Sequence, residues 1–197
     1  MLTPFFIGKN MKNIKSYLIT DPNYFSDNKE IFKEKLIAVL KNHKIDFACF
    51  RDKSSKNIEE LAKIFLQICK EFKIENILIN SNISLAIKLG FDGVHLNSQQ
   101  FDKIENAKKS NLITIISCHN LEELEKAMNK NIDFVTYSPI FDTPNKGQSK
   151  GVDKLNEVIE KFPNLKIFAL GGIIQNEQIK EIEKTKAYGF ASIRYFI

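Results

Sequence analysis

Short apolar runs recur along the chain, and each is followed by a segment whose apolar residues recur at helical spacing. The runs are too short for helices and predict eight strands, at residues 16–20, 45–50, 77–80, 92–96, 112–117, 133–138, 167–170 and 189–193. The segments between them predict about seven helices. The first is capped near Ser26, and the others cover roughly residues 57–72, 85–89, 99–109, 121–129, 151–162 and 175–186.

This alternation predicts an α/β fold, a compact single-domain (β/α)₈ barrel that covers residues 1–197 and lacks the helix after its last strand. A doubly wound open sheet is the alternative, but such sheets more often stop at five or six strands. The flank left without a helix favours a homodimer, because it would otherwise expose apolar surface.

Composition narrows the class of protein. An apolar content of 43% and a charged content of 27% describe an ordinary globular chain. The net charge of +5 comes from lysines scattered among acids, with no basic stripe, so we expect no nucleic-acid partner. The N-terminal stretch from Leu2 to Ile7 is broken by Pro4, and no run approaches membrane length, so we expect a cytoplasmic protein without a membrane partner.

Cysteine usage agrees with a reducing compartment. Cys49, Cys69 and Cys118 show no Cys-x-x-Cys spacing, which argues against both a disulfide framework and a zinc site. Cys118 precedes His119, but strand alternation turns the two side chains to opposite faces, so we do not expect a thiol nucleophile. Of the other histidines, His95 is expected to be structural in the middle of a strand, and His43 to be exposed.

Candidate chemistry gathers where the predicted strands end, which in a barrel is the active-site face. Only two of the 29 basic residues are arginines, and both Arg51 and Arg194 follow strand ends. Gly171 and Gly172 follow another strand and can bring backbone amides against an anion. The predicted rim comprises Asp21, Arg51, Lys53, Asn80, residues 96–100, 117–119 and 138–146, Gly171, Gly172 and residues 192–194. Its polar, basic character predicts a phosphorylated small molecule.

Seven short motifs in order along the chain resemble the thiamine-phosphate synthase superfamily, which also contains the thiazole tautomerases (TenI). They are Tyr17-Leu-Ile-Thr-Asp21, Phe50-Arg-Asp-Lys53, Ile79-Asn80, Asp92-Gly-Val-His-Leu96, Ser117-Cys-His119, Pro139-Ile-Phe-Asp-Thr143 with Lys146, and Leu170-Gly-Gly-Ile173. Each motif is weak alone, but together they cover nearly the whole chain.

The resemblance implies a set of roles. Synthases join an aminopyrimidine diphosphate to a thiazole phosphate and release pyrophosphate. The resemblance implies that Arg51, Lys53 and Lys146 bind the diphosphate. It adds Asn80, Ser117 and Thr143 as further substrate-binding residues. It implies that Gly171, Gly172, Ser192 and Ile193 bind the thiazole phosphate. Arg194 stands where the family usually has a small residue, so it is either a direct phosphate contact or an exposed terminal residue.

The sequence departs from the family where two acidic residues normally carry magnesium. Ser81 follows Asn80 in place of an aspartate, and Ser98-Gln99-Gln100 replaces a Gln-Glu-Asp type run. Serine and amides bind Mg²⁺ poorly, because the ion prefers hard anionic oxygens. We therefore expect no metal site and no cofactor, with Mg²⁺ required only if the protein is a true synthase.

The lost carboxylates favour the tautomerase branch, which needs no metal and shifts a proton on the thiazole ring. The resemblance makes His119 the proton carrier, with Lys146 as a second catalytic residue, and histidine suits the task because its pKa lies near neutrality. Synthases often have a histidine here too, and His119 could instead only orient the Ser117 loop. The main expectation is thus a metal-independent thiazole tautomerase; the alternatives are a Mg²⁺-dependent synthase and a non-catalytic binder of thiazole phosphate or thiamine phosphate.

Overall fold

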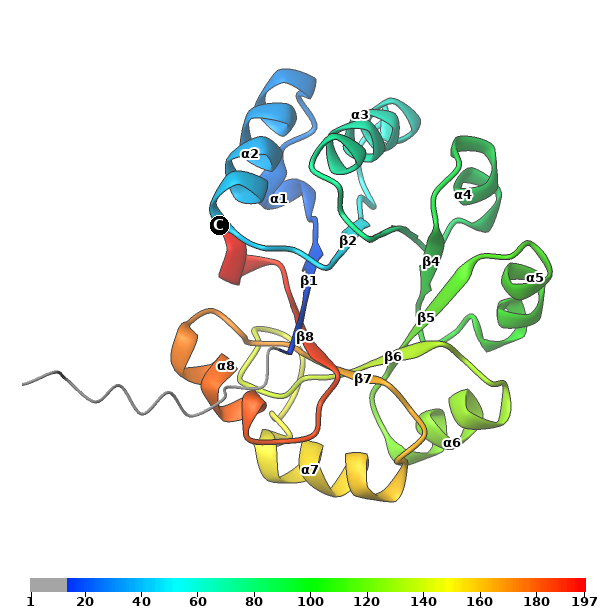
Figure 1. Cartoon of the computed structure of the whole chain (residues 1–197), viewed down its shortest axis with the longest axis vertical. Coiled ribbons are helices and arrows are strands. Elements are labelled where there is room, and N and C mark those ends of the chain that lie inside the picture. The colour runs from blue at the N-terminus through cyan, green and yellow to red at the C-terminus, as the bar shows by residue number, and fades with distance from the viewer. Residues whose placement is uncertain (1–13) are drawn as a thin grey trace, which may run out of the picture.

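Eight parallel strands close into a barrel in the computed structural model, which describes residues 14–197 (Figure 1). The strands follow one another around the barrel in chain order, and pairing between β1 and β8, with Leu18 opposite Ser192, closes it. They are β1 Lys15–Ile19, β2 Phe47–Phe50, β3 Asn76–Asn80, β4 Gly93–Leu96, β5 Ile113–Cys118, β6 Phe134–Tyr137, β7 Ile167–Leu170 and β8 Gly189–Ser192. The predicted (β/α)₈ barrel is confirmed.

Helices surround the barrel, so the strands are buried on both faces, which explains their apolar runs (Figure 1). They are α1 Pro22–Phe25, α2 Lys29–Asn42, α3 Ile58–Glu71, α4 Ile83–Leu89, η1 Phe101–Lys103, α5 Ile104–Lys109, α6 Leu121–Asn129, α7 Gly151–Lys161, α8 Asn176–Glu183 and η2 Arg194–Phe196. The sequence pattern missed α1, because one turn is too short to show a periodicity. The helix predicted at 99–109 begins instead as the 3₁₀ turn η1. The stretch Leu2–Ile7 lies outside the described residues.

Aromatic rings fill the inside of the barrel. Tyr17, Phe47 and Phe168 pack with ring centroids 5.1–5.8 Å apart. Gly189 makes room for them, since a Cβ there would lie 2.6 Å from the Phe168 ring. This dense packing closes the barrel below its C-terminal mouth and gives the site a rigid floor.

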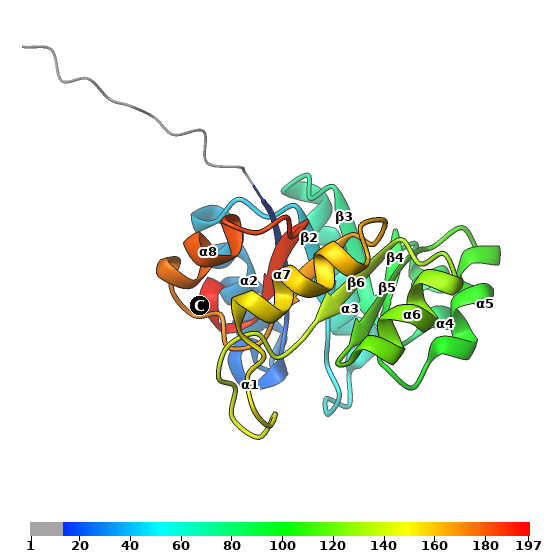
Figure 2. The same cartoon turned by 90° about the horizontal axis from the view of Figure 1, so that it is seen from below.

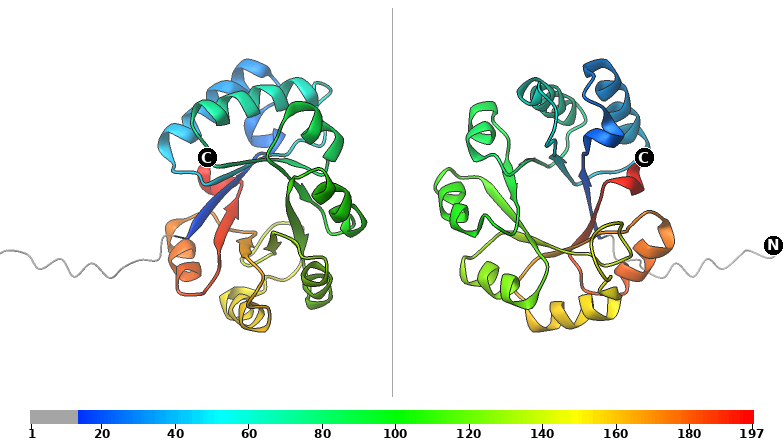
Figure 3. Two further views of the ribbon diagram at one scale, coloured as in Figure 1. Left: turned by 45° about the vertical axis from the view of Figure 1, so that its right-hand side comes forward. Right: turned by 180° about the vertical axis from the view of Figure 1, so that it is seen from behind.

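The segment after β8 forms η2 where the barrel pattern calls for another helix. Figures 1 and 3 place this turn between α2 and α8. Phe196 is buried against Phe190, and its ring centroid lies 5.4 Å from that of His43. The prediction that His43 is exposed is therefore wrong: the ring is half-buried, and burial lowers its pKa. Within residues 14–197 no helix is both long and apolar enough to cross a membrane.

Candidate functional site

A cavity of about 580 Å³ opens at the C-terminal ends of the strands. Figure 2 shows α1 and the long β6–α7 loop reaching out from this same end of the molecule. All twelve residues predicted for the site line this cavity: Arg51, Lys53, Asn80, Ser117, His119, Thr143, Lys146, Gly171, Gly172, Ser192, Ile193 and Arg194. The barrel thus brings together residues from six strand ends.

Positive charge dominates the cavity. Arg51 and Lys53 follow β2, Lys146 and Lys150 lie in the loop before α7, and Arg194 follows β8. No aspartate or glutamate is among the described residues that line it. Cations concentrated in a concave site attract and hold anionic ligands. Asp21 lies beside the cavity and forms an ion pair with Arg51.

The Arg51–Asp21 pair is built by local structure. Asp21 caps the N-terminus of α1 by accepting a hydrogen bond of 3.1 Å from the backbone N–H of Asn23. The backbone N–H of Arg51 donates to the hydroxyl of Thr20 at 2.8 Å. The end of β1 therefore holds both the backbone and the guanidinium of Arg51, so its remaining N–H groups have a defined orientation toward a ligand.

Gly171 and Gly172 form a tight turn after β7, with φ of +98° and +72°. A Cβ on Gly172 would lie 2.5 Å from the carbonyl oxygen of Phe141. A Cβ on Gly171 would lie 2.8 Å from the Cα of Pro139 and 3.3 Å from the hydroxyl of Thr143. Only glycine permits both the conformation and this contact with the β6–α7 loop. The turn therefore lets its backbone lie in direct contact with the backbone of the β6–α7 loop.

The loop after β8 is tied to this turn. The hydroxyl of Ser192 donates to the carbonyl of Ile173 at 2.8 Å and accepts from the backbone N–H of Tyr195 at 3.1 Å. The Ser192 side chain is thus occupied in holding two loops together. A phosphate contact at Ser192 and Ile193 would come from their backbone amides, as in the phosphate sites of other barrels.

His119 lies immediately after β5, where its ring lines the cavity. Its Nδ1 is 3.1 Å from the hydroxyl of Ser138 and 3.3 Å from the Ser138 carbonyl oxygen. The backbone N–H of His119 donates to the carboxylate of Glu123 in α6. Cys118 is buried on the opposite, outer face, where burial raises the pKa of its thiol. The predicted alternation, with Cys118 and His119 on opposite faces of β5, is confirmed. Because Nδ1 of His119 faces Ser138, its Nε2 is the ring nitrogen that can contact a ligand.

His95 combines a structural role with a place in the cavity wall. Its Nδ1 lies 2.9 Å from the hydroxyl of Tyr17, and its Nε2 lies 3.0 Å from the hydroxyl of Ser117. Burial, and to a smaller extent the charge of Arg51, lower its pKa to about 3. The ring is therefore neutral at physiological pH and holds the Ser117 hydroxyl in place. The prediction of a structural histidine omitted this link to the site.

Neutral His95 should make stability depend on pH. The folded state keeps the ring unprotonated down to about pH 3, whereas the unfolded chain binds a proton below about pH 6.5. The free energy of unfolding should thus fall by about 1.4 kcal/mol per pH unit as pH drops through this window. Urea titrations at pH 7 and pH 5 should show a smaller pH dependence for His95→Gln than for the wild type. Equal slopes for His95→Gln and the wild type would refute the assignment.

Three further residues of the cavity were not identified from the sequence: Tyr24, Gln148 and Lys150. Tyr24 lies in α1, whose single turn has no periodic signal. Lys150 precedes α7 in a polar loop, and its ammonium lies 5.4 Å from the centroid of the Tyr137 ring. Its position in the loop that follows β6 was a sign that it could reach the rim of the barrel. Sequence spacing does not show where a loop of this length lies in space, so the residue was not predicted.

The residues at the two expected magnesium positions do not fit a protein-held Mg²⁺ ion. The Gln100 side chain accepts from the backbone N–H of Asn97 at 3.1 Å and donates to the carbonyl of Ser81 at 3.2 Å. The Ser81 hydroxyl accepts from the Asn80 amide at 3.0 Å. These neutral groups bind one another, and residues 14–197 contain no cluster of three His, Cys, Asp or Glu side chains that could hold a metal.

Comparison with known proteins agrees with this architecture. The profile of the family described as thiamine monophosphate synthase matches residues 16–196. A protein of Aquifex aeolicus named "Putative thiamine-phosphate synthase 2" is 37% identical over 186 residues, which cover 92% of this chain and 96% of that protein. The thiamine-phosphate synthase of Pelagibacter ubique is 32% identical over 170 residues, covering 84% and 81%.

A solved structure shows the same fold. The thiamine phosphate pyrophosphorylase from Pyrococcus furiosus superposes with a TM-score of 0.78 at 26% identity, covering 91% of this chain and 85% of that one. The family match spans nearly all described residues, including every motif that lines the cavity. The chain therefore belongs to the thiamine-phosphate synthase family, a family of enzymes with the barrel fold seen here.

Proposed function

We propose that the protein is a thiamine-phosphate synthase, which joins an aminopyrimidine diphosphate to a thiazole phosphate and releases pyrophosphate. The observation that carries the proposal is the presence of two anion-binding regions in one cavity. Arg51 and Lys53 lie at the β2 end, and the Gly171–Gly172 turn lies at the β7 end. A synthase must hold two phosphorylated substrates together, and the names of the relatives support the same reaction.

The roles that the family resemblance implies are compatible with the positions of these residues in the cavity. Arg51, Lys53 and Lys146 would hold the diphosphate, and their charges would stabilise the pyrophosphate as it leaves. Asn80, Ser117 and Thr143 would hydrogen-bond the substrates. The Gly171–Gly172 turn, with Ser192, Ile193 and Arg194 beside it, would hold the thiazole phosphate. Holding the two reactants in contact supplies much of the acceleration, because it removes the entropic cost of their encounter.

A thiazole tautomerase is the second candidate, and it was the main expectation from the sequence. Two observations favour it: His119 presents a ring nitrogen to the cavity, and Ser81 and Gln100 are neutral. The reaction needs a proton carrier and one phosphate site, and no metal. The names of the relatives favour the synthase over this candidate, so the tautomerase stays unconfirmed. The predicted homodimer and the single-domain extent over residues 1–197 also stay predictions.

Product analysis separates these candidates. The purified protein is incubated with thiazole carboxylate phosphate alone, and with thiazole phosphate together with aminopyrimidine diphosphate, each in Mg²⁺ and in EDTA. We expect thiamine phosphate in the reactions that contain both substrates. Conversion of the thiazole alone to its aromatic isomer, abolished in His119→Asn and with no coupled product, would instead identify a tautomerase. Binding of thiazole phosphate without any product would leave only a binding protein.

A further inference from the structure

A second hollow of about 590 Å³ lies beside the cavity, at the ends of β3 and β4. It shares Lys53, Asn80 and Asn97 with the main cavity, so the two hollows meet at these side chains. Ser81 lies in its wall, at one of the positions where the family resemblance leads one to expect a magnesium carboxylate. Any anion that extends from the main cavity past Asn80 therefore enters this hollow.

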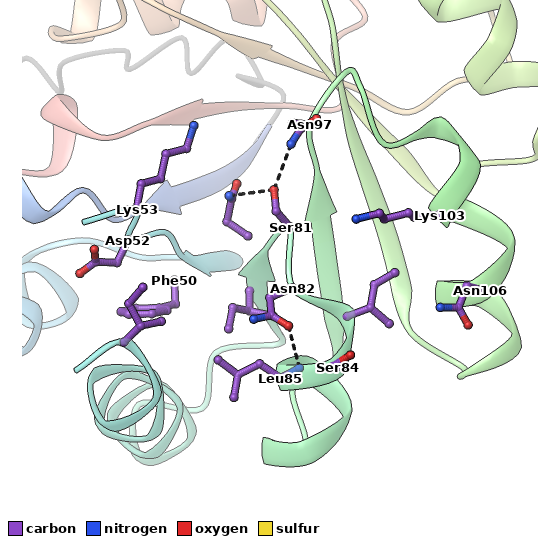
Figure 4. A pocket seen from close by; sticks show the side chains of 14 residues that line it. Phe50, Asp52, Lys53, Ser81, Asn82, Ser84, Leu85, Asn97, Lys103 and Asn106 are labelled. Atoms are coloured by element: carbon purple, nitrogen blue, oxygen red, sulfur yellow. Dashed lines mark hydrogen bonds between the residues drawn. The ribbon is translucent and has the colours of Figure 1, made fainter. Parts of the chain in front are cut away.

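The charge of this hollow is set by two lysines. Figure 4 shows Lys53 and Lys103 on either side of Ser81 and Asn97. The ion pairs formed among residues 14–197 include neither lysine. Asp52 also contributes to the lining, but its carboxylate accepts hydrogen bonds from its own loop, from the backbone N–H groups of Ser54 and Ser55 and from the Ser55 hydroxyl. The two ammonium groups are thus available to a ligand.

The remaining polar lining is neutral and consists of amides and hydroxyls: Asn80, Ser81, Asn82, Ser84, Asn97 and Asn106. Ser81 adopts a left-handed conformation, with φ of +61°, and its hydroxyl accepts from the amides of Asn80 and Asn97 at 3.0 and 3.4 Å. With both contacts accepted by its oxygen, the hydroxyl hydrogen of Ser81 can be donated to a ligand. Two lysines against the single carboxylate of Asp52 leave the hollow with a net positive charge, which favours an anion over a divalent cation.

We propose that Lys103 binds the same diphosphate that Arg51, Lys53 and Lys146 hold, from the side where the main cavity meets this hollow at Lys53 and Asn80. Its charge, and that of the released pyrophosphate's other partner Lys53, would take the place of the metal ion that Ser81 and Gln100 do not hold. The inference deepens the proposed synthase function and rests on it for the identity of the anion. Lys103 enters the site because η1 directly follows the β4 loop and carries it to the edge of the hollow. A lysine is a mobile point charge, which suits a leaving group that must later depart.

Calorimetric titration with inorganic pyrophosphate in EDTA tests the inference without catalysis. We expect the wild-type protein to bind, and Lys103→Gln to bind roughly tenfold more weakly, because one charge-assisted contact is lost. Lys109→Gln is the matched control: it removes the same charge from the next helix, where Lys109 pairs with Glu105 at 2.7 Å outside the hollow. That variant should bind as the wild type does, and circular dichroism should show that both variants are folded.

The outcomes separate this inference from the proposed function. Pyrophosphate binding that requires Mg²⁺, or that is the same in Lys103→Gln as in the wild type, would overturn the role of Lys103. Binding that depends on Lys103 in EDTA, in a protein that forms no thiamine phosphate, would refute the synthase while the anion site stands. Thiamine phosphate formed by a protein whose pyrophosphate affinity does not depend on Lys103 would confirm the synthase and refute the site.

Discussion

Gly172→Ala is expected to weaken binding of thiazole phosphate by roughly 100-fold, because movement of the turn would remove a hydrogen bond to a charged group, worth about 1.5–3 kcal/mol. A Cβ at this position would lie 2.5 Å from the carbonyl oxygen of Phe141 and 2.6 Å from that of Asp142. Both contacts are with backbone, which cannot rotate away as a flexible side chain could. Either the turn or the β6–α7 loop must move, and both line the cavity.

The matched control is Gly90→Ala. Gly90 ends α4 with φ of +78°, close to the +72° of Gly172, but a Cβ there has no heavy atom within 4 Å. Both variants carry the cost of a left-handed alanine, about 1 kcal/mol of stability. Titration with thiazole phosphate should detect weakened binding only in Gly172→Ala. Equal affinities in the two variants would show that the turn does not hold the phosphate.

Arg51→Gln is expected to lower kcat/KM for aminopyrimidine diphosphate by roughly 100-fold, because the variant loses a bidentate charged contact with the substrate. Arg51 is the cation whose position is defined most completely, by Asp21 through the guanidinium and by Thr20 through the backbone. The loss should appear mainly with the diphosphate substrate. Steady-state kinetics with each substrate varied in turn would measure it.

Two variants distinguish charge from geometry at this position. Arg51→Lys keeps the positive charge without the planar fork, and should recover only part of the lost kcat/KM. Asp21→Asn keeps Arg51 but removes the ion pair that orients it, so a smaller decrease is expected. Full activity in Arg51→Lys would mean that the site needs only a charge, and unchanged activity in Arg51→Gln would remove Arg51 from the diphosphate site.

Much of the site could be predicted from the sequence because a barrel places all strand ends on one rim. Arg51, Asn80 and His119 each follow an apolar run, and their common location depends only on recognising eight such runs. Periodicity is a local property of the chain, so it was sufficient for the strands and for the alternation that separates Cys118 from His119. The family resemblance then supplied the chemistry.

Other features were decided only by contacts between distant segments. His95 was predicted to be structural from its apolar neighbours, but its bonds to Tyr17 and Ser117 join strands that are separated along the chain. From the sequence, the neutral Ser81 and Gln100 indicated only that a metal site had been lost. The structure shows in addition that the two residues are joined by a hydrogen bond from the Gln100 amide to the Ser81 carbonyl. Lys103, a lysine among many in the sequence, becomes significant only because η1 places it across the hollow from Lys53 (Figure 4).

The sequence by itself determined the barrel, the rim and the identity of the residues on it, because strand and helix periods and strand-end positions are encoded locally. The tertiary structure alone decided which cations converge, which polar groups are already satisfied by one another, and where a second hollow opens beside Asn80. The physical reason is that charge density and hydrogen-bond satisfaction are sums over neighbours in space, and these neighbours come from segments that only folding brings together.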